Sequence, residues 1–165
     1  MTVLDGLLLP GEGVGLRRAV ADDVPAIVGL LADDELGADR DGISGDKDLA
    51  VYVAAFQQID ADPAHLLLVA TEGPQVVATM QLTFLPGLAR RAALRAQVEA
   101  VRVRGDFRGR GLGAALLQWA IDEAGRRGCR LVQLSSDKSR DDAHRFYARF
   151  GFVATHEGYK LTLPS

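Results

Sequence analysis

A glycine-rich turn, Arg108-Gly109-Arg110-Gly111-Leu112-Gly113, constrains this 165-residue chain more than any other feature. It lies between an apolar run that predicts a strand, Val98 to Val103, and an amphipathic run that predicts a helix, Leu112 to Arg127. A glycine turn before a helix leaves backbone N–H groups without partners, and these groups together with the helix dipole favour an anion, above all a phosphate. We therefore expect the turn to bind a phosphate-bearing ligand.

Two nucleotide-binding motifs with related glycine spacing do not fit this chain. Gly109-x-Gly111-x-x-Ala114 matches the dinucleotide-binding pattern, but it follows the fourth expected strand and is followed by only about fifty residues. The acidic residue that would bind the ribose is also missing at the required spacing, since Asp137 lies too far along the chain. A Walker loop would need a Gly-Lys-Ser/Thr ending, which is absent. An arginine-rich surface turn without a ligand remains the alternative.

Composition narrows the class of protein. Apolar residues make up 48% of the chain, which is enough for a single domain over residues 1–165, with residues 1–13 as a loose lead-in. The net charge of −3 argues against a nucleic-acid-binding or membrane-surface protein. The single cysteine, Cys129, excludes an internal disulfide. Because we find neither a signal peptide nor a membrane-spanning stretch, we expect a cytoplasmic protein.

Hydrophobic periodicity predicts the element order β-α-α-β-β-β-α-β-α-β, an α/β fold with a mixed sheet and helices on both faces. Asp22 and Asp23 are expected to cap the first helix, and Glu72-Gly73-Pro74 predicts a hairpin. The expected strands are 14–20, 65–71, 75–85, 98–104 and 130–135, then a final strand pair ending near Leu163. The later helices are expected at 48–59, 112–127 and 141–150.

Three motifs together resemble the GNAT superfamily of acetyl-CoA-dependent N-acetyltransferases. Arg108-x-x-Gly111-x-Gly113 is similar to the family's pyrophosphate loop. Val101-Arg102-Val103 lies where family members bond pantetheine with the backbone of the fourth strand, and Ala143-x-x-Phe146-Tyr147-x-x-x-Gly151-Phe152 is similar to the C-terminal signature. The resemblance runs from Val14 to Leu163 and implies a mixed, mostly antiparallel sheet.

The resemblance implies acetyl-CoA as co-substrate and transfer of its acetyl group to a primary amine by direct attack. The pyrophosphate would bind the N–H groups of the turn, with Arg108 and Arg110 as charge partners. The implied cofactor-binding residues are Val101, Arg102, Val103, Arg108, Gly109, Arg110, Gly111, Leu112 and Gly113. A non-catalytic acyl-CoA-binding sensor or regulatory module on the same fold is the alternative.

Glu99 and Tyr147 are the candidate catalytic residues. Glu99 shares strand parity with Val101 and Val103, so we expect it to face an apolar side, where a partly desolvated carboxylate suits a general base. A structural glutamate paired to Arg95 or Arg102 is the alternative. By resemblance, the Val101 N–H would bind the oxyanion and Tyr147 would protonate the leaving thiolate; a core tyrosine is the alternative for Tyr147.

Two further observations limit the site. The three histidines and the cysteine show no metal-ligand spacing, so we expect no metal. Arg140 stands where many family members have a cofactor-contacting asparagine, and we assign it no role.

The charge of the acceptor is left open by two conflicting signals. Residues 33–48 are rich in aspartate, and an acidic rim there would attract a cationic amine, although a solvated loop is the alternative. The segment from Asp141 to Tyr147 resembles the aminoalkylphosphonate N-acetyltransferase branch, and on that reading Arg90, Arg91 and Arg95 would meet an anionic acceptor. Exposed edge strands near the C-terminus make a homodimer an additional possibility.

Overall fold

The computed structural model describes residues 13–34 and 37–164. The predicted lead-in, apart from Gly13, therefore lies outside the described residues. So does Glu35 of the aspartate-rich segment 33–48, which we call the acidic loop. The chain forms two compact units, residues 1–133 and 134–165. None of the helices in the described ranges is long and apolar enough to cross a membrane.

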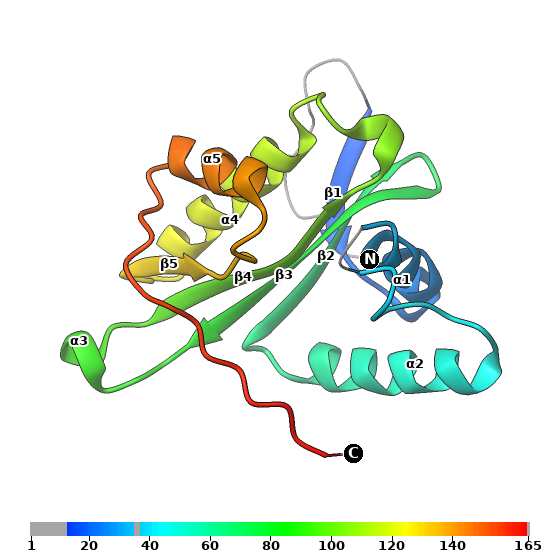
Figure 1. The fold of residues 1–165 in the computed structure, drawn as a ribbon, viewed down its shortest axis with the longest axis horizontal. Helices are drawn as coiled ribbons and strands as arrows, with labels where there is room; N and C mark the ends of the chain where they lie inside the picture. The colour runs from blue at the N-terminus through cyan, green and yellow to red at the C-terminus, as the bar shows by residue number, and fades with distance from the viewer. Residues whose placement is uncertain (1–12, 35–36, 165) are drawn as a thin grey trace. The chain divides into compact units, whose positions relative to one another are not determined.

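The first unit contains a sheet with the strand order β1-β2-β3-β4-β5 (Figure 1). Its strands are β1 (Val14–Arg18), β2 (His65–Glu72), β3 (Gln75–Leu85), β4 (Arg95–Val103) and β5 (Leu131–Leu134), whose last residue begins the second unit. The pairs β1–β2, β2–β3 and β3–β4 are antiparallel. The predicted hairpin is confirmed, because Glu72 pairs with Gln75 across a turn where Gly73 has a φ of +54°.

Helices cover both faces of this sheet (Figure 1). Strand β1 leads through a 3-10 turn, η1 (Ala21–Asp23), into α1 (Val24–Ala32), and α2 (Asp46–Ala61) precedes β2. Val24, Ile27 and Phe56 of α1 and α2 pack with Val69 of β2 on one face. On the other face, α4 (Leu112–Arg126) contacts β3 and β4 and buries the apolar stripe expected from its sequence, including Leu112, Leu116, Leu117 and Ala120.

The predicted cap of the first helix is confirmed in position only: Asp23 is the N-cap residue of α1, but no side-chain hydrogen bond caps the helix. The Asp23 carboxylate does not cap α1; it accepts a hydrogen bond from the Val20 N–H (2.8 Å) and forms a two-pronged ion pair with Arg17 (2.6 and 2.8 Å). The intervening 3-10 turn directs the carboxylate backwards along the chain. Burial raises the pKa of Asp23, but the hydrogen bonds from Arg17 and Val20 and the charge of Arg17 outweigh it, so this pKa lies below its ordinary value.

The described part of the second unit contains one helix, α5 (Asp141–Arg149), in which the Phe146 ring packs edge-on against Tyr147 and at a tilt against Phe150. The predicted final strand pair is wrong, since residues 152–164 form no strand. Tyr159, Leu161 and Leu163 alternate along this segment as in a strand, but their side chains are between 75% and 91% exposed. A strand pair without a covered apolar face has little to stabilise it.

Candidate functional site

The glycine turn after β4 has the backbone conformation that an anion cradle needs. After a short 3-10 turn, η2 (Gly105–Phe107), Gly109 and Gly111 adopt φ values of +77° and +84°. Gly111 is the N-terminal cap of α4, and no described side chain caps this end of the helix. A Cβ atom added at Gly109 or Gly111 would meet nothing within 4 Å in the described structure. The turn therefore leaves room for a ligand against backbone N–H groups.

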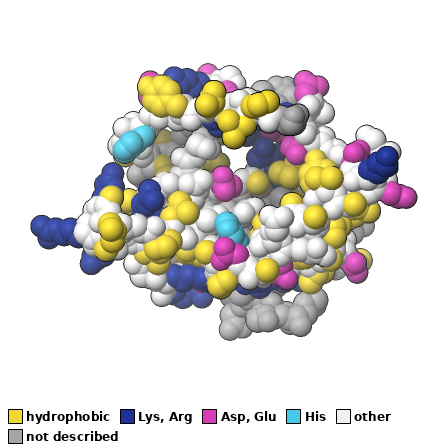
Figure 2. Space-filling model, turned by 90° about the horizontal axis from the view of Figure 1, so that it is seen from below, with side chains coloured by type: hydrophobic (Ala, Val, Ile, Leu, Met, Phe, Trp, Pro, Cys, Tyr) yellow, Lys and Arg dark blue, Asp and Glu magenta, His cyan; other side chains and the backbone are white. Residues whose placement is uncertain are grey.

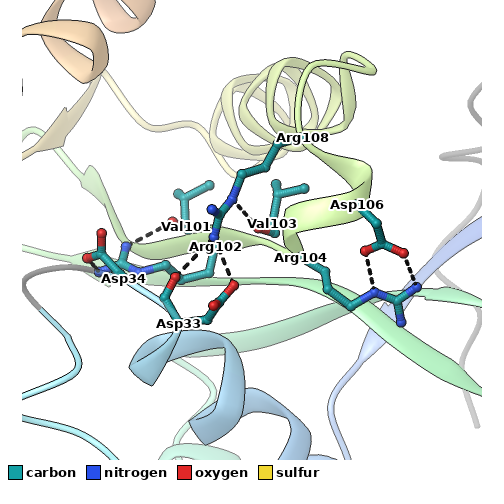
Figure 3. Close-up of polar contacts among 8 residues, drawn as sticks. All are labelled: Asp33, Asp34, Val101, Arg102, Val103, Arg104, Asp106 and Arg108. Atoms are coloured by element: carbon teal, nitrogen blue, oxygen red, sulfur yellow. Dashed lines mark hydrogen bonds and ion pairs between the residues drawn. The ribbon is translucent and has the colours of Figure 1, made fainter.

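Arg108 is fastened to neighbouring elements (Figure 3). Its Nε donates to the Val103 carbonyl (3.0 Å), and its guanidinium also contacts the carbonyl and the carboxylate of Asp33 (3.1 Å each), just past the end of α1. Arg110 lies over the Phe107 ring, 4.9 Å from its centroid. The acidic loop is thus linked to the glycine turn. Sequence reasoning missed this contact, which joins residues 75 positions apart.

A bulge in β4 changes the direction of its side chains. Gln81 pairs with Glu99 but Thr79 pairs with Arg102, so β4 has one extra residue, and Ala100 adopts a φ of +53°. Glu99 and Arg102 pair with Gln81 and Thr79, on the face that α1 and α2 cover. The side chains of Val101 and Val103 point toward α4 (Figure 3). A bulge also interrupts the ladder of hydrogen bonds, which leaves backbone polar groups available for a ligand.

This bulge corrects the expectation for Glu99. The predicted shared parity of Glu99 with Val101 and Val103 is wrong, because the extra residue reverses the alternation between them. Glu99 is exposed, so the expected desolvation is also absent. Within the described ranges, Arg102 pairs with Asp34 (3.3 Å) and Arg95 donates to Gln133 (3.4 Å), so neither forms the ion pair considered for Glu99. The carboxylate is available to a ligand on the α1 face.

Arg102 connects the bulge to the acidic loop. Its guanidinium donates to the Val101 carbonyl (2.9 Å) and forms the ion pair with Asp34, and both side chains are largely buried. The orientation of the Val101 peptide therefore depends on a residue of the loop that precedes α2.

The acidic loop itself borders a surface hollow of about 400 Å³, lined in part by Asp39, Asp41, Asp48 and Tyr52. Two of these carboxylates hold the loop: Asp48 accepts from the Ser44 N–H (2.9 Å), and the Tyr52 hydroxyl donates to Asp41 (3.3 Å). The described residues contain no group of histidine, cysteine, aspartate or glutamate side chains that could hold a metal ion.

Tyr147 lies in the second unit, on α5. Its ring packs edge-on against Phe146 (5.3 Å between centroids) and near Phe152 (6.0 Å). Arg140 is the N-terminal cap residue of α5. These contacts hold the tyrosine ring through its aromatic neighbours.

Comparison with known proteins places these features in context. The profile of the acetyltransferase (GNAT) family matches residues 32–152. The aminoalkylphosphonate N-acetyltransferase of Salmonella typhimurium is 29% identical over 141 residues, which cover 86% of each chain. A solved structure described as a transcriptional regulator from Bacillus halodurans is 43% identical, with a TM-score of 0.86, and covers 91% of this chain and 99% of its own. A putative acetyltransferase from Agrobacterium tumefaciens is 30% identical, with a TM-score of 0.77, and the match covers 90% and 99% of the two chains.

Proposed function

Because the chain belongs to the acetyltransferase (GNAT) family, we propose that it transfers an acetyl group from acetyl-CoA to a primary amine of a small molecule or peptide. The observation that carries this proposal is the uncapped start of α4 behind two left-handed glycines, which fits a pyrophosphate. When bound, acetyl-CoA supplies the activated acetyl group, and the residues of this chain orient it and handle the protons.

Each residue has a proposed task. The N–H groups from Arg108 to Gly113 hold the pyrophosphate, and the backbone of Val101 to Val103 holds the pantetheine arm. The Val101 N–H, beside the bulge, stabilises negative charge on the carbonyl oxygen. Glu99 accepts the amine proton, directly or through water, and the Tyr147 hydroxyl donates a proton to the leaving thiolate. Glu99 is exposed on the α1 face, which supports its proposed role toward the acceptor.

The experiment is a panel of amines incubated with acetyl-CoA while free thiol release is followed. The name of the Salmonella relative makes aminoalkylphosphonates the first acceptors to include. Thiol release that requires both an amine and Glu99 supports the proposal, with Glu99→Gln compared with Glu72→Gln at the end of β2.

Gly111→Trp tests the donor site directly. We expect it to abolish acetyl-CoA binding in calorimetry, because the indole would fill the cradle. Gly128→Trp is a matched control at the opposite end of α4: Gly128 also has a φ of +77° and open space around its Cβ position. Normal affinity in Gly111→Trp, or equal loss in both variants, contradicts the assignment of the turn.

A non-catalytic acyl-CoA-binding regulatory module is the second candidate, favoured by the description of the 43% identical structure as a transcriptional regulator. Tight acetyl-CoA binding with no thiol release across a broad amine panel would support this alternative.

A further inference from the structure

A second surface hollow, of about 420 Å³, is lined mostly by arginines. Arg90 and Arg91 come from α3 (Ala89–Ala92), and Arg130 lies just before β5; Ala93 and Leu131 complete the lining. We call this the arginine hollow. Figure 2 shows basic side chains gathered at the left, the end where α3 lies in Figure 1. The arginine hollow lies at the Arg95 end of β4, and the glycine turn follows the Val103 end. Eight residue steps along a strand separate the two ends, about 26 Å.

The arginine hollow carries positive charge that the described part of the chain does not neutralise. Arg90, Arg91 and Arg130 have no carboxylate partner among the described residues. Seven other arginines of the first unit do have one: Arg17, Arg18, Arg102, Arg104, Arg108, Arg126 and Arg127. Three guanidinium groups around one hollow repel one another unless an anion lies between them. In a chain of net charge −3, this local excess of positive charge points to an anionic ligand.

The backbone at this hollow is also strained. Arg90, Arg91 and Ala92 adopt φ values of +55°, +59° and +58°, a left-handed conformation that is unfavourable for residues with a Cβ atom. The turn is closed by hydrogen bonds from the Ala92 N–H to the Leu88 carbonyl and from the Ala93 N–H to the Ala89 carbonyl. The Arg130 N–H donates to the Leu94 carbonyl (2.8 Å), which fixes the third arginine beside this turn. Strained backbone conformations that the surrounding structure holds in place occur mainly at ligand-binding and active sites.

We propose that the arginine hollow binds a phosphate or phosphonate group, carried by the acceptor amine. Three guanidinium forks match the several oxygens of a phosphorus oxyanion better than the two oxygens of a single carboxylate. The identification of the ligand as the acceptor rests on the proposed function; the anion site itself does not.

A polar row along β4 runs from Glu99 toward the end of the strand where the arginine hollow lies. Arg95, Gln97 and Glu99 share the α1 face, since they pair with Leu85, Thr83 and Gln81. The row is braced by Gln133, which donates to Gln97 (2.8 Å) and accepts from Arg95 (3.4 Å). Four residue steps separate Glu99 from Arg95, about 13 Å, and the hollow lies beyond. We therefore expect acceptors with a long spacer between amine and phosphonate to bind better than short ones.

A binding measurement tests the anion site without any catalysis. Methylphosphonate and inorganic phosphate are titrated into the full chain, the triple variant R90Q/R91Q/R130Q, and the control R126Q, an exposed arginine on α4. Glutamine is shorter than arginine, but it keeps a polar side chain with a Cβ atom, so it makes the same demand on the left-handed backbone while it removes the charge. We expect methylphosphonate and phosphate affinity to fall by at least about tenfold in the triple variant, the loss of several charge-assisted hydrogen bonds. Unchanged affinity, or no binding to the wild type, overturns the proposal.

A kinetic measurement tests whether the anion belongs to the acceptor. A series of ω-aminoalkylphosphonates of increasing length is compared with uncharged alkylamines of equal length. We expect the triple variant to raise KM about tenfold for the long phosphonates, with kcat and the alkylamine kinetics unchanged. Methylphosphonate binding without any KM effect assigns the hollow to a free anion and overturns the acceptor assignment. If no amine is acetylated, the proposed function fails while the binding measurement still decides the anion site.

Discussion

Replacing Asp33 with asparagine should tighten acetyl-CoA binding. In the structure the Asp33 carboxylate lies 3.1 Å from the guanidinium of Arg108, the first residue of the proposed pyrophosphate cradle. A pyrophosphate bound there competes with this carboxylate for Arg108 and is repelled by its charge. Asparagine removes the charge but leaves the Asp33 backbone carbonyl and the Val103 carbonyl as partners of Arg108.

The size of this effect follows from exposure. The side chains of Arg108 and Asp33 are 55% and 60% exposed, so water and salt screen the pair. Exposed ion pairs of this kind contribute about 0.2–1 kcal/mol, which corresponds to acetyl-CoA binding about 1.4-fold to 5-fold tighter. Because the Debye length is about 10 Å at 0.1 M salt, the gain should shrink as salt rises.

Calorimetric titration of acetyl-CoA at two salt concentrations measures this effect, with Asp60→Asn as the control. Asp60 also forms an exposed ion pair, with Arg18 (3.7 Å), away from the turn. Weaker binding in Asp33→Asn would refute competition and show that the carboxylate instead holds Arg108 in a binding geometry. An equal gain in Asp60→Asn would refute a local effect.

Three further predictions address the fold and the chemistry. Tyr147→Phe should slow acetyl transfer with little loss of acetyl-CoA affinity, and unchanged turnover across a pH series would remove the hydroxyl from the mechanism. The pKa of Asp23 is lowered in the folded state. The ionised carboxylate therefore stabilises the fold at pH values above the unfolded pKa of an aspartate, about 3.9, and this stabilisation is lost as the pH falls through the lower pKa of the folded state. Asp23→Asn should therefore lower the free energy of unfolding at pH 7 by about 3 kcal/mol, measured in urea. Below about pH 4 the free energy of unfolding should fall less steeply with pH in the variant than in the wild type, and an unchanged pH dependence would contradict this. Ala100→Val places a β-branched residue at a φ of +53° and should lower the free energy of unfolding by about 1–3 kcal/mol, whereas Ala100→Gly should be tolerated.

Elements with a strong periodic pattern were predictable from the sequence. The strand expected at 75–85 forms with those bounds, and the apolar stripe of α4 is buried as expected. Such patterns suffice because each residue's environment depends on neighbours three or four positions away in a helix, or two in a strand. The exposed C-terminal segment marks the limit of this reasoning. Tyr159, Leu161 and Leu163 have the alternation of a strand, but alternation stabilises a strand only where another surface covers it.

Features set by pairing between distant residues were not predictable. Nothing local in the sequence of β4 marks a bulge at Ala100; its position follows from the register with β3, and it reverses the inferred face of Glu99. The arginine hollow is a second case. Arg90 and Arg91 were candidates for an anion site from the sequence, but Arg130 joins them through a hydrogen bond to Leu94, 36 residues earlier in the chain.

The bulge also bears on how one strand serves two ligands. Without an extra residue, Glu99, Val101 and Val103 would share one face, and the proposed base would compete for space with the packing of α4. With it, the valine side chains face α4 (Figure 3). Glu99 lies on the α1 face, so the backbone proposed to bind acetyl-CoA and the proposed base need not occupy the same side of the sheet. Arg102 ties this geometry to the acidic loop through Asp34 and the Val101 carbonyl. A substitution at Asp34 should therefore affect the chemical step through the Val101 peptide, even though Asp34 itself has no proposed contact with either ligand.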